Sequence, residues 1–525
     1  MRSGPKEGNL RKFRVMEREK ERIEDELERY RGREQRLVEM MGLLSHKISL
    51  NDLLDRLVRT LREATVSDAG SIYLVEEYET LRFAVAQTDS CEIPFTSFTI
   101  PISDSTIAGY VAKTGETLRF ADVYAIDASY PFHFNADFDK KFGYRTRSMI
   151  AAPLKNQKNE IIGVVQLINR KTAWEERVRS PEDADRCVLP YTNYDEDFLN
   201  ILAAAAAIAI ERASLYEGIE RLLRGIVESS AASIESRDKT TAGHSQRIAA
   251  YMVVLAKRID KCQEGFWKDV HFDRDQIREV FYAAMLHDIG KIGVREHVLT
   301  KANKLSDDRL ETIRLRIELQ KMREPERAEE WDEIFRFISE VNIPGFLEDE
   351  RYERLKEIAG IPIVVAGQTR PLLDDFEFEN LSVRKGNLTE AERKEIESHV
   401  AHSLEILKRI PWTDDLKNVP IIAGTHHEKL NGKGYPSGLR KEEIPLEGRM
   451  LAVVDIFEAL TAMDRPYKRA MPVEKALEIL RTEAKFGGLQ SEIVEFFIEK
   501  KVYEVISDEL RKNFTLTSEE ILALE

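Results

Sequence analysis

Strand-like segments occur only in the first half of the chain, and this division limits the fold more than any other feature. Between about 46 and 212, an amphipathic helix at 50–61 precedes four runs rich in β-branched residues. Asn156-Gln-Lys-Asn159, between the last two runs, is typical of a hairpin connection. Beyond about 219 the pattern is almost wholly helical. The chain is therefore predicted to be multidomain, with an α/β domain followed by an all-α helical bundle. The four predicted strands are 70–75, 81–85, 148–154 and 161–168.

Length, charge and cysteine usage narrow the class of protein. A chain of 525 residues suggests two to four domains. The net charge of −15 argues against a nucleic acid polymer as partner, because such partners need a basic surface. Cys91, Cys187 and Cys262 form neither a disulfide framework nor a zinc pattern. The longest apolar run, 201–210, is too short to cross a bilayer, and the N-terminus has no apolar signal segment. We therefore expect a cytoplasmic protein without a membrane partner.

Two further helices are predicted outside the globular domains. Residues 1–45 alternate acidic and basic side chains with few apolar ones, which indicates a charged helix or coiled coil; a solvated single helix or a frayed tail is the alternative. A connector helix at 198–240 overlaps both domains. Its apolar stripe favours a parallel homodimer. The stripe consists of Ile208, Leu215, Ile219, Leu222 and Ile226.

Several histidines occur in settings that suit metal binding. His287-Asp288 ends an apolar stretch, so an imidazole and a carboxylate emerge together from a core helix, and Lys291 follows on the same face. His426-His427 follows a second apolar stretch. Each of these features alone is more often structural than functional.

The segments after His427 add groups that suit a phosphorylated ligand. Gly432, Gly434 and Pro436 predict a shaped loop whose backbone N–H groups could approach an anion. Asp455 lies in an apolar helix, where a carboxylate is costly unless it is paired or metal-bound. The segment 464–468 offers two cations beside an aromatic ring, which suits phosphate and base recognition.

Together these motifs resemble the HD-GYP family of HD-domain metal phosphohydrolases, over about 219–485. Members of the family that the chain resembles hydrolyse cyclic di-GMP to pGpG or GMP with two or three bound metal ions. The resemblance implies an HD-GYP phosphodiesterase domain at 219–525. The matching motifs are Arg237-Asp238, Gly243-His244-Ser245, His287-Asp-Ile-Gly-Lys291, His399, His426-His-Glu428, Gly434-Tyr-Pro436, Val454-Asp455 and Arg465-Pro-Tyr-Lys468.

Carried over residue by residue, the resemblance implies two metal positions that share Asp288 as a bridge. The first would be held by His244, His287, Asp288 and Asp455, and the second by His399, His426 and His427. Such a pair of ions can activate a water for attack on a phosphodiester. The resemblance also implies that Lys291 and Asp238 act beside the metals. The residues that it implies for substrate binding are Gly434, Tyr435, Pro436, Arg465 and Lys468.

The chain departs from the family in three places. Members with a third metal carry a glutamate where this chain has Thr240, so we expect two ions, iron or manganese, although such a site also accepts zinc or nickel. The segment 304–316 resembles the segment 387–399, but it has Arg316 at the position where the family has a ligand histidine. The second segment begins with a capping box at Thr389 and has His399 at that position. We therefore predict an insertion at about 317–386, which could be a lid, a dimer contact or a neutral elaboration. His402, one turn beyond His399, is expected to flank the site rather than bind metal.

Residues 46–212 resemble a GAF domain, a small-molecule sensor with an antiparallel sheet flanked by helices. The resemblance lies in Phe134-Asn135, in the segment from Asp139 to Pro153, and in Asn169-Arg-Lys171. The resemblance implies that this domain either binds a small molecule similar to a cyclic nucleotide or serves only in dimerisation. Cys91 and His133 lack the context that a bilin or haem site would need.

The sequence therefore predicts a GAF-regulated, two-metal phosphodiesterase that hydrolyses cyclic di-GMP. One alternative is a receptor or adaptor that binds cyclic di-GMP without cleaving it. Another is an HD phosphohydrolase that acts on a different cyclic dinucleotide or on a nucleotide monoester. The full ligand set and Lys291 favour an enzyme over a receptor.

Overall fold

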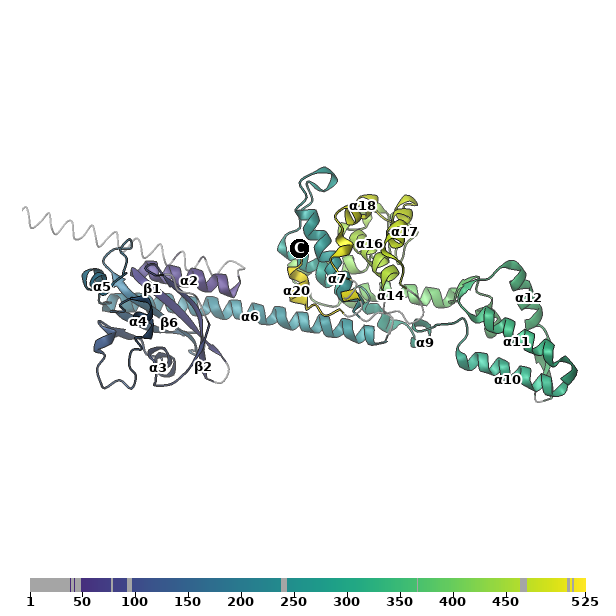
Figure 1. Ribbon diagram of the computed structural model, residues 1–525, viewed down its shortest axis with the longest axis horizontal. Helices are drawn as coiled ribbons and strands as arrows, with labels where there is room; N and C mark the ends of the chain where they lie inside the picture. The colour runs from purple at the N-terminus through teal and green to yellow at the C-terminus, as the bar shows by residue number, and fades with distance from the viewer. Residues whose placement is uncertain are drawn as a thin grey trace, which may run out of the picture. The chain divides into compact units, whose positions relative to one another are not determined.

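The computed structural model describes residues 38, 42, 49–76, 79–91, 97–237, 243–365, 367–462, 470–507, 510–511 and 514–525 (Figure 1). The chain divides into two compact units, Met1–Leu222 and Leu223–Glu525, and helix α6 (Asn193–Arg237) contributes residues to both. Apart from residues 38 and 42, the charged helix predicted at 1–45 lies outside the described residues.

The first unit is built on one antiparallel sheet, in the order β3-β2-β1-β6-β5-β4, with β7 paired to β6. Each of the four predicted strands is present, and β5 and β6 form the predicted hairpin. The strands are β1 (Ser67–Glu76), β2 (Thr80–Thr88), β3 (Thr99–Pro101), β4 (Leu118–Phe120), β5 (Met149–Lys155), β6 (Ile161–Lys171) and β7 (Val188–Leu189). The helices are α2 (Leu50–Thr65), α3 (Ile107–Thr114), α4 (Asp137–Phe142), α5 (Pro181–Cys187) and the first part of α6, with a 3₁₀ turn at η1 (Val123–Ala125).

Both faces of this sheet are buried, because successive side chains of a strand point to opposite sides. Ile150 and Ala152 of β5 pack with α2 and α6, whereas Met149 and Ala151 of the same strand pack with α3. Phe132 completes the second layer. The prediction of an α/β domain with a flanked antiparallel sheet is confirmed.

The Asn169–Lys171 segment, part of the GAF resemblance, has a clear structural role. The Asn169 side chain donates to the Tyr144 hydroxyl (2.9 Å) and accepts from the backbone N–H of Arg147 (2.7 Å). The buried ammonium of Lys171 lies 3.4 Å from Asp68 and 3.1 Å from Asp89. These bonds join the end of β6 to β1 and to the loop before β5, so the segment stabilises the domain whether or not it binds a ligand.

The second unit is a helical bundle around one large core. The helices that supply this core are the end of α6, α7 (His244–Asp260), α8 (Arg274–Leu286), α14 (Glu390–Lys408), α15 (Val419–Ala423), α16 (Leu446–Thr461), α17 (Val473–Lys485), α18 (Ser491–Glu499) and α20 (Ser518–Ala523). Short connections include α9 (Glu296–Leu299) and the 3₁₀ turns η2 (Gly265–Trp267), η3 (Ile289–Gly293), η5 (Asp414–Leu416), η6 (Lys441–Glu443) and η7 (Val502–Glu504). This confirms the predicted helical bundle.

The predicted insertion forms a hydrophobic core of its own, which extends from Leu305 to Leu381. Its start differs from the predicted boundary: residue 317 falls inside α10, whose Ile313 already packs in this separate core. The segment is also not purely helical, because β8 pairs with β11 and β9 with β10. Its elements are α10 (Asp307–Arg323), η4 (Pro325–Arg327), α11 (Ala328–Asn342), β8 (Gly345–Phe346), α12 (Asp349–Ala359), β9 (Pro362–Val365), β10 (Gln368–Pro371), α13 (Asp375–Leu381) and β11 (Lys385–Gly386).

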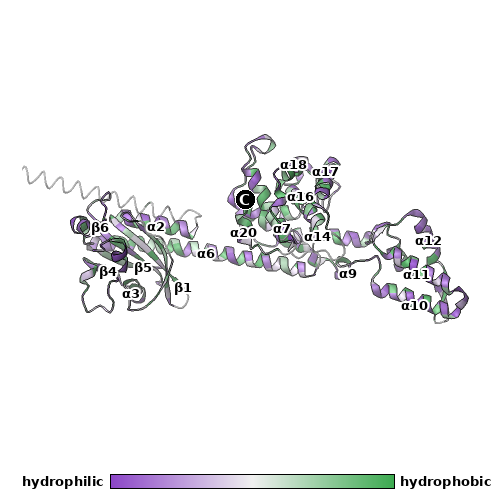
Figure 2. Cartoon of the chain, viewed as in Figure 1, coloured by the Kyte–Doolittle hydropathy of each residue, from purple (hydrophilic) through white to green (hydrophobic). Residues whose placement is uncertain are grey.

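Helix α6 combines a buried segment with an exposed apolar stripe. Phe198, Leu199 and Leu202 belong to the core of the first unit. Further along, the exposed side chains are Leu215 (63%), Ile219 (62%), Leu222 (65%) and Ile226 (54%). Figure 2 shows apolar and polar residues interspersed along this helix. By length and composition α6 could cross a membrane, and 44% of its most apolar window is buried inside the protein.

Candidate metal centre

All seven predicted ligands converge in the second unit. His244 is the first residue of α7, His287 and Asp288 directly follow α8, His399 lies in α14, His426 and His427 follow α15, and Asp455 lies in α16. Their potential ligand atoms form three groups, and within each group the atoms lie within 4.8 Å of one another. The groups are His244 with His287 and Asp455, His287 with Asp288 and His426, and His399 with His426 and His427. The first and last of these groups correspond to the two predicted metal positions, and the middle group combines one histidine of each with Asp288.

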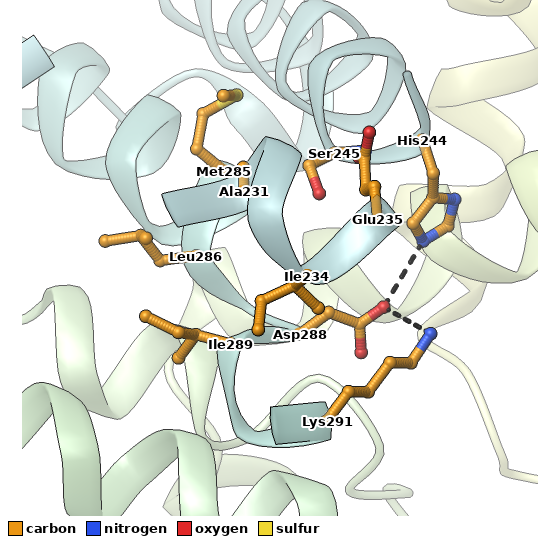
Figure 3. Close-up of a pocket in the computed structure, with 10 residues that line it drawn as sticks. All are labelled: Ala231, Ile234, Glu235, His244, Ser245, Met285, Leu286, Asp288, Ile289 and Lys291. Atoms are coloured by element: carbon orange, nitrogen blue, oxygen red, sulfur yellow. Dashed lines mark hydrogen bonds and ion pairs between the residues drawn. The ribbon is translucent and has the colours of Figure 1, made fainter. Parts of the chain in front are cut away.

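Asp288 lies where the two positions meet. Its carboxylate oxygens are 3.7 Å from His244 Nε2 and 3.3 Å from His399 Nε2. Lys291 Nζ lies 2.8 Å away, on the 3₁₀ turn η3 rather than on a continuous α-helix (Figure 3). Burial raises the pKa of Asp288, but Lys291 and His287 outweigh it and hold that pKa well below its ordinary value. The group is therefore an ionised carboxylate at neutral pH, as a bridging ligand must be.

Three of the histidines have one ring nitrogen fixed by the backbone and the other turned into the site. The Nδ1 atoms of His287, His399 and His426 each lie 2.6 Å from the carbonyl oxygen three residues earlier, so each ring keeps its proton on Nδ1. The opposite nitrogen, Nε2, is buried in each ring and makes no well-formed hydrogen bond among the described residues, although Asp288 lies 3.4 Å from that of His287 and 3.3 Å from that of His399. In His287, burial lowers the pKa but Asp288 outweighs it and raises the pKa to about 9, so a bound cation would displace the proton from Nε2. Buried nitrogens without partners are costly, and a bound cation satisfies them. The donor set therefore fits metal ions.

The charge state of the adjacent pair supports the same interpretation. Burial lowers the pKa of His426 well below its ordinary value, and His427 adds to this effect. Burial also lowers the pKa of His427 to about 4, although Asp455 opposes it. Both rings are therefore neutral at pH 7 and can offer a lone pair.

The η3 turn packs unusually close to α14. A Cβ at Gly290 would lie 1.9 Å from the carbonyl oxygen of His399, so this approach requires glycine. Ser403 joins the two segments: its hydroxyl accepts from Gly290 N (2.8 Å) and donates to the carbonyl of His287 (2.7 Å). This contact places His399 beside Asp288.

His402 lies away from the ligand groups. A Cβ at Gly293 would approach His402 Nδ1 to 2.4 Å, so this imidazole packs against the end of η3. Among the described residues it belongs to none of the three groups of potential metal ligands. The geometry thus agrees with His399 as the ligand and His402 as a flanking residue.

The loop after His427 is shaped by a buried glutamate. Glu428 accepts hydrogen bonds from the backbone N–H groups of Ser437 (2.7 Å) and Leu439 (2.9 Å). A Cβ at Gly434 would lie 2.3 Å from Lys429 N, so only glycine fits there. The Tyr435 ring lies over His427 with centroids 4.9 Å apart, and the Tyr435–Pro436 peptide bond is cis. Tyr435 is thus presented at the edge of the second ligand group.

Four residues of the sequence prediction cannot be placed. Asp238, Thr240, Arg465 and Lys468 lie outside the described residues. Their roles stay predictions.

The structure adds Glu458, which the sequence reasoning missed. Glu458 lies one helical turn after Asp455 on α16 and contacts both His244 and Arg247. Burial raises its pKa, but His244 and Arg247 outweigh burial and lower the pKa to about 2. The signal was available, because Glu458 is a second acidic residue in the same apolar helix as Asp455.

The end of α6 is bonded to two of the segments that carry the site. The Glu235 carboxylate accepts from the N–H groups of Gly243 (2.7 Å) and Ser245 (2.9 Å) at the N-terminus of α7. These bonds satisfy N–H groups that the N-cap, Gly243, has no side chain to bond. The Arg237 guanidinium donates to the carbonyls of Ile292 (3.0 Å) and Val294 (3.2 Å), at the end of η3. Helix α6 therefore supports both His244 and the turn that carries Lys291.

Comparisons with known proteins agree with both parts of the fold. The GAF domain model matches residues 49–210, and the HD domain model matches residues 377–488. The chain is 26% identical over 292 residues to a protein named 3'3'-cGAMP-specific phosphodiesterase 3 of Vibrio cholerae, which covers 56% of this chain and 40% of the relative. It is 37% identical over 136 residues to a protein named cyclic di-GMP phosphodiesterase of Thermotoga maritima, covering 24% of this chain and 34% of the relative. A solved GAF domain/HD domain protein from Geobacter sulfurreducens is 15% identical, with a TM-score of 0.24, and the match covers 34% of this chain and 98% of that one.

The chain thus spans well under half the length of these two curated relatives. It carries a GAF domain in its first half and an HD domain in its second half.

Proposed function

We propose that this protein, which joins a GAF domain to an HD domain, hydrolyses a cyclic dinucleotide with two divalent metal ions. The observation that carries the proposal is the convergence of five histidines and two aspartates, with three buried Nε2 atoms directed into one site. HD-domain relatives named as cyclic dinucleotide phosphodiesterases support the substrate class.

Each residue of the site has a proposed part. His244, His287 and Asp455 would hold one ion, and His399, His426 and His427 the other, with Asp288 between them. The bound pair would supply Lewis acidity and an activated water for phosphodiester cleavage. Lys291, which pairs with Asp288 at 2.8 Å, is proposed to meet a phosphate oxygen. We expect iron or manganese, and Asp238 is proposed to act beside the ions.

Substrate recognition is assigned to the loop after His427 and to the segment after α16. Tyr435 offers an aromatic face next to His427 for a guanine base, and Gly434 and Pro436 fix its position. Arg465 and Lys468 are proposed to contact phosphate or base. We favour cyclic di-GMP as substrate. The relative named for 3'3'-cGAMP, which matches 56% of this chain, makes that dinucleotide the second candidate.

The experiment is a hydrolysis assay with the anaerobically purified protein, loaded with iron or with manganese. Cyclic di-GMP and 3'3'-cGAMP are supplied separately, and the products are separated by chromatography. We expect linear products from at least one dinucleotide and none after the metals are removed with EDTA. Binding without product from either dinucleotide would instead support the receptor alternative.

We also propose that the GAF domain regulates the HD domain through α6. Its support is the pair of contacts from Glu235 to the start of α7 and from Arg237 to the end of η3. A seven-residue insertion after Gly218 preserves helical phase and should keep the hydrolysis rate, whereas a two-residue insertion should change the rate but not the metal content. Equal rates in both variants would contradict regulation through this helix. Either a cyclic-nucleotide-like ligand or dimerisation alone could supply the signal.

The cellular location of the protein is also a proposal. The apolar residues at the start of α6 pack inside the GAF domain, and a cyclic dinucleotide is an intracellular signal. We therefore infer a cytoplasmic enzyme.

A further inference from the structure

His244 is held differently from the other ligand histidines. His287, His399 and His426 donate Nδ1–H to the backbone carbonyl three residues earlier. His244 is the first residue of α7, so no residue of its own helix lies three positions before it. Its Nδ1 instead contacts a carboxylate oxygen of Glu458, from α16.

Glu458 is itself fixed. Its other oxygen accepts a hydrogen bond from Arg247 Nε (2.7 Å) and forms an ion pair with Arg247 Nη2 (2.7 Å). Glu458, His244 and Arg247 are each 5% exposed or less. A carboxylate held by a cation on one side and an imidazole on the other cannot turn to solvent.

The opposite side of the imidazole faces the site. His244 Nε2 lies 3.5 Å from Asp455 and 3.7 Å from Asp288. Because an ionised carboxylate only accepts hydrogen bonds, Glu458 keeps the ring proton on Nδ1 and leaves the Nε2 lone pair free.

We propose that Glu458 is a positioning residue that aims His244 at the metal position of His287 and Asp455, with Arg247 as its anchor. The inference rests on the proposed two-metal function and extends it to a residue outside the ligand set. A carboxylate behind a ligand imidazole fixes the ring and raises its basicity, and loss of such a partner typically weakens metal binding about 10- to 100-fold.

The test is Glu458→Gln in the full-length protein, with manganese affinity measured by competition with a chelator. Glutamine has a single carbonyl oxygen for two donors, so it cannot hold His244 and Arg247 together. We expect one of two ions to bind about 10- to 100-fold more weakly and the other to bind as in the parent.

A second variant separates positioning from simple charge balance. Glu458→Gln leaves Arg247 without its partner and should lower thermal stability for that reason alone. Glu458→Gln/Arg247→Met removes the unpaired charge, and it should recover stability while the metal affinity stays weak. If the double variant also recovers the parental metal affinity, Glu458 serves only as the counter-charge of Arg247 and the inference is wrong.

Glu279→Gln is the matched control. Glu279 is also a buried glutamate of the helical bundle, but it accepts from the Asn418 backbone (2.6 Å) and not from a histidine, so its loss should leave both ions bound. Parental protein that binds no divalent ion would overturn the proposed function together with this inference. Parental protein that binds two ions, with a Glu458→Gln variant that binds both equally well, would overturn the inference alone.

Discussion

At the scale of single residues, the site depends on which ring nitrogens reach the centre. His399 and His402 are one helical turn apart on α14, yet only His399 contributes to a ligand group among the described residues. His402 packs against Gly293 instead. Two histidines only three residues apart on one helix thus have different proposed roles, His399 as a metal ligand and His402 as a supporting side chain.

This difference gives the first prediction. His399→Ala should lose the second ion and nearly all turnover, because it removes one of three nitrogens that hold it. His402→Ala should keep both ions and lose at most about 10- to 100-fold in rate. Metal analysis and hydrolysis rates of the two variants, measured side by side, check this, and an exchange of the two results would show that the ligand is His402.

The sequence predicted the candidate metal ligands but not the residues that orient them. His287-Asp288 and His426-His427 were recognisable because each follows an apolar helix, and Asp455 because it interrupts one. The roles of Glu458 and Ser403 were missed, since they arise only when α7, α14 and α16 pack together. Glu458 did leave a local signal, as a second acidic residue in the same apolar helix as Asp455, but the residues that it contacts did not follow from that pattern.

At the scale of elements, the close contact between η3 and α14 brings the two ligand groups together. Gly290 faces the backbone of α14, whereas Gly293 faces only the movable side chain of His402. The two glycines therefore form a natural pair for testing this contact.

We predict that Gly290→Ala displaces α14 and lowers the affinity for the second ion, with a loss of hydrolysis. A methyl group 1.9 Å from the carbonyl oxygen of His399 forces the backbone to move. Gly293→Ala should be milder, because the His402 ring can rotate away. Manganese titration of both variants is the measurement, and equal behaviour would mean that this close approach does not position His399.

The sequence predicted the types of the elements better than it predicted the boundary of the insertion. The strands, the capping box at Thr389 and the long helix α6 followed from local pattern. The start of the insertion did not, because α10 continues as one helix through residue 317 while its apolar face packs in the separate core of the insertion. The spacing of apolar residues predicts a helix, but tertiary packing decides in which hydrophobic core that helix is buried.

At the scale of the whole molecule, α6 carries an apolar stripe that the described part of the chain leaves exposed. Leu215, Ile219, Leu222 and Ile226 are spaced four, three and four residues apart, the spacing of a coiled-coil seam. We infer that a second copy of the chain covers it in a parallel dimer.

The prediction is that the protein is a dimer at micromolar concentration and that Ile219→Glu/Leu222→Glu makes it a monomer. Buried carboxylates at a seam cost more than the seam contributes. Ser214→Glu/Arg221→Gln changes the net charge by the same two units at exposed positions off the seam and should remain dimeric. Light scattering distinguishes the outcomes, and a monomeric parent would end the proposal.

The central claim is that the converging histidines and aspartates form one two-metal centre that hydrolyses a cyclic dinucleotide. The most direct measurement is metal content and product formation in the same preparations of the parent and of Asp288→Ala. We predict about two ions per parental chain with linear product, and loss of both ions and of product in the variant, because Asp288 approaches both ligand groups. A variant that keeps its metals and its activity, or a metal-loaded parent that forms no product, would contradict the account.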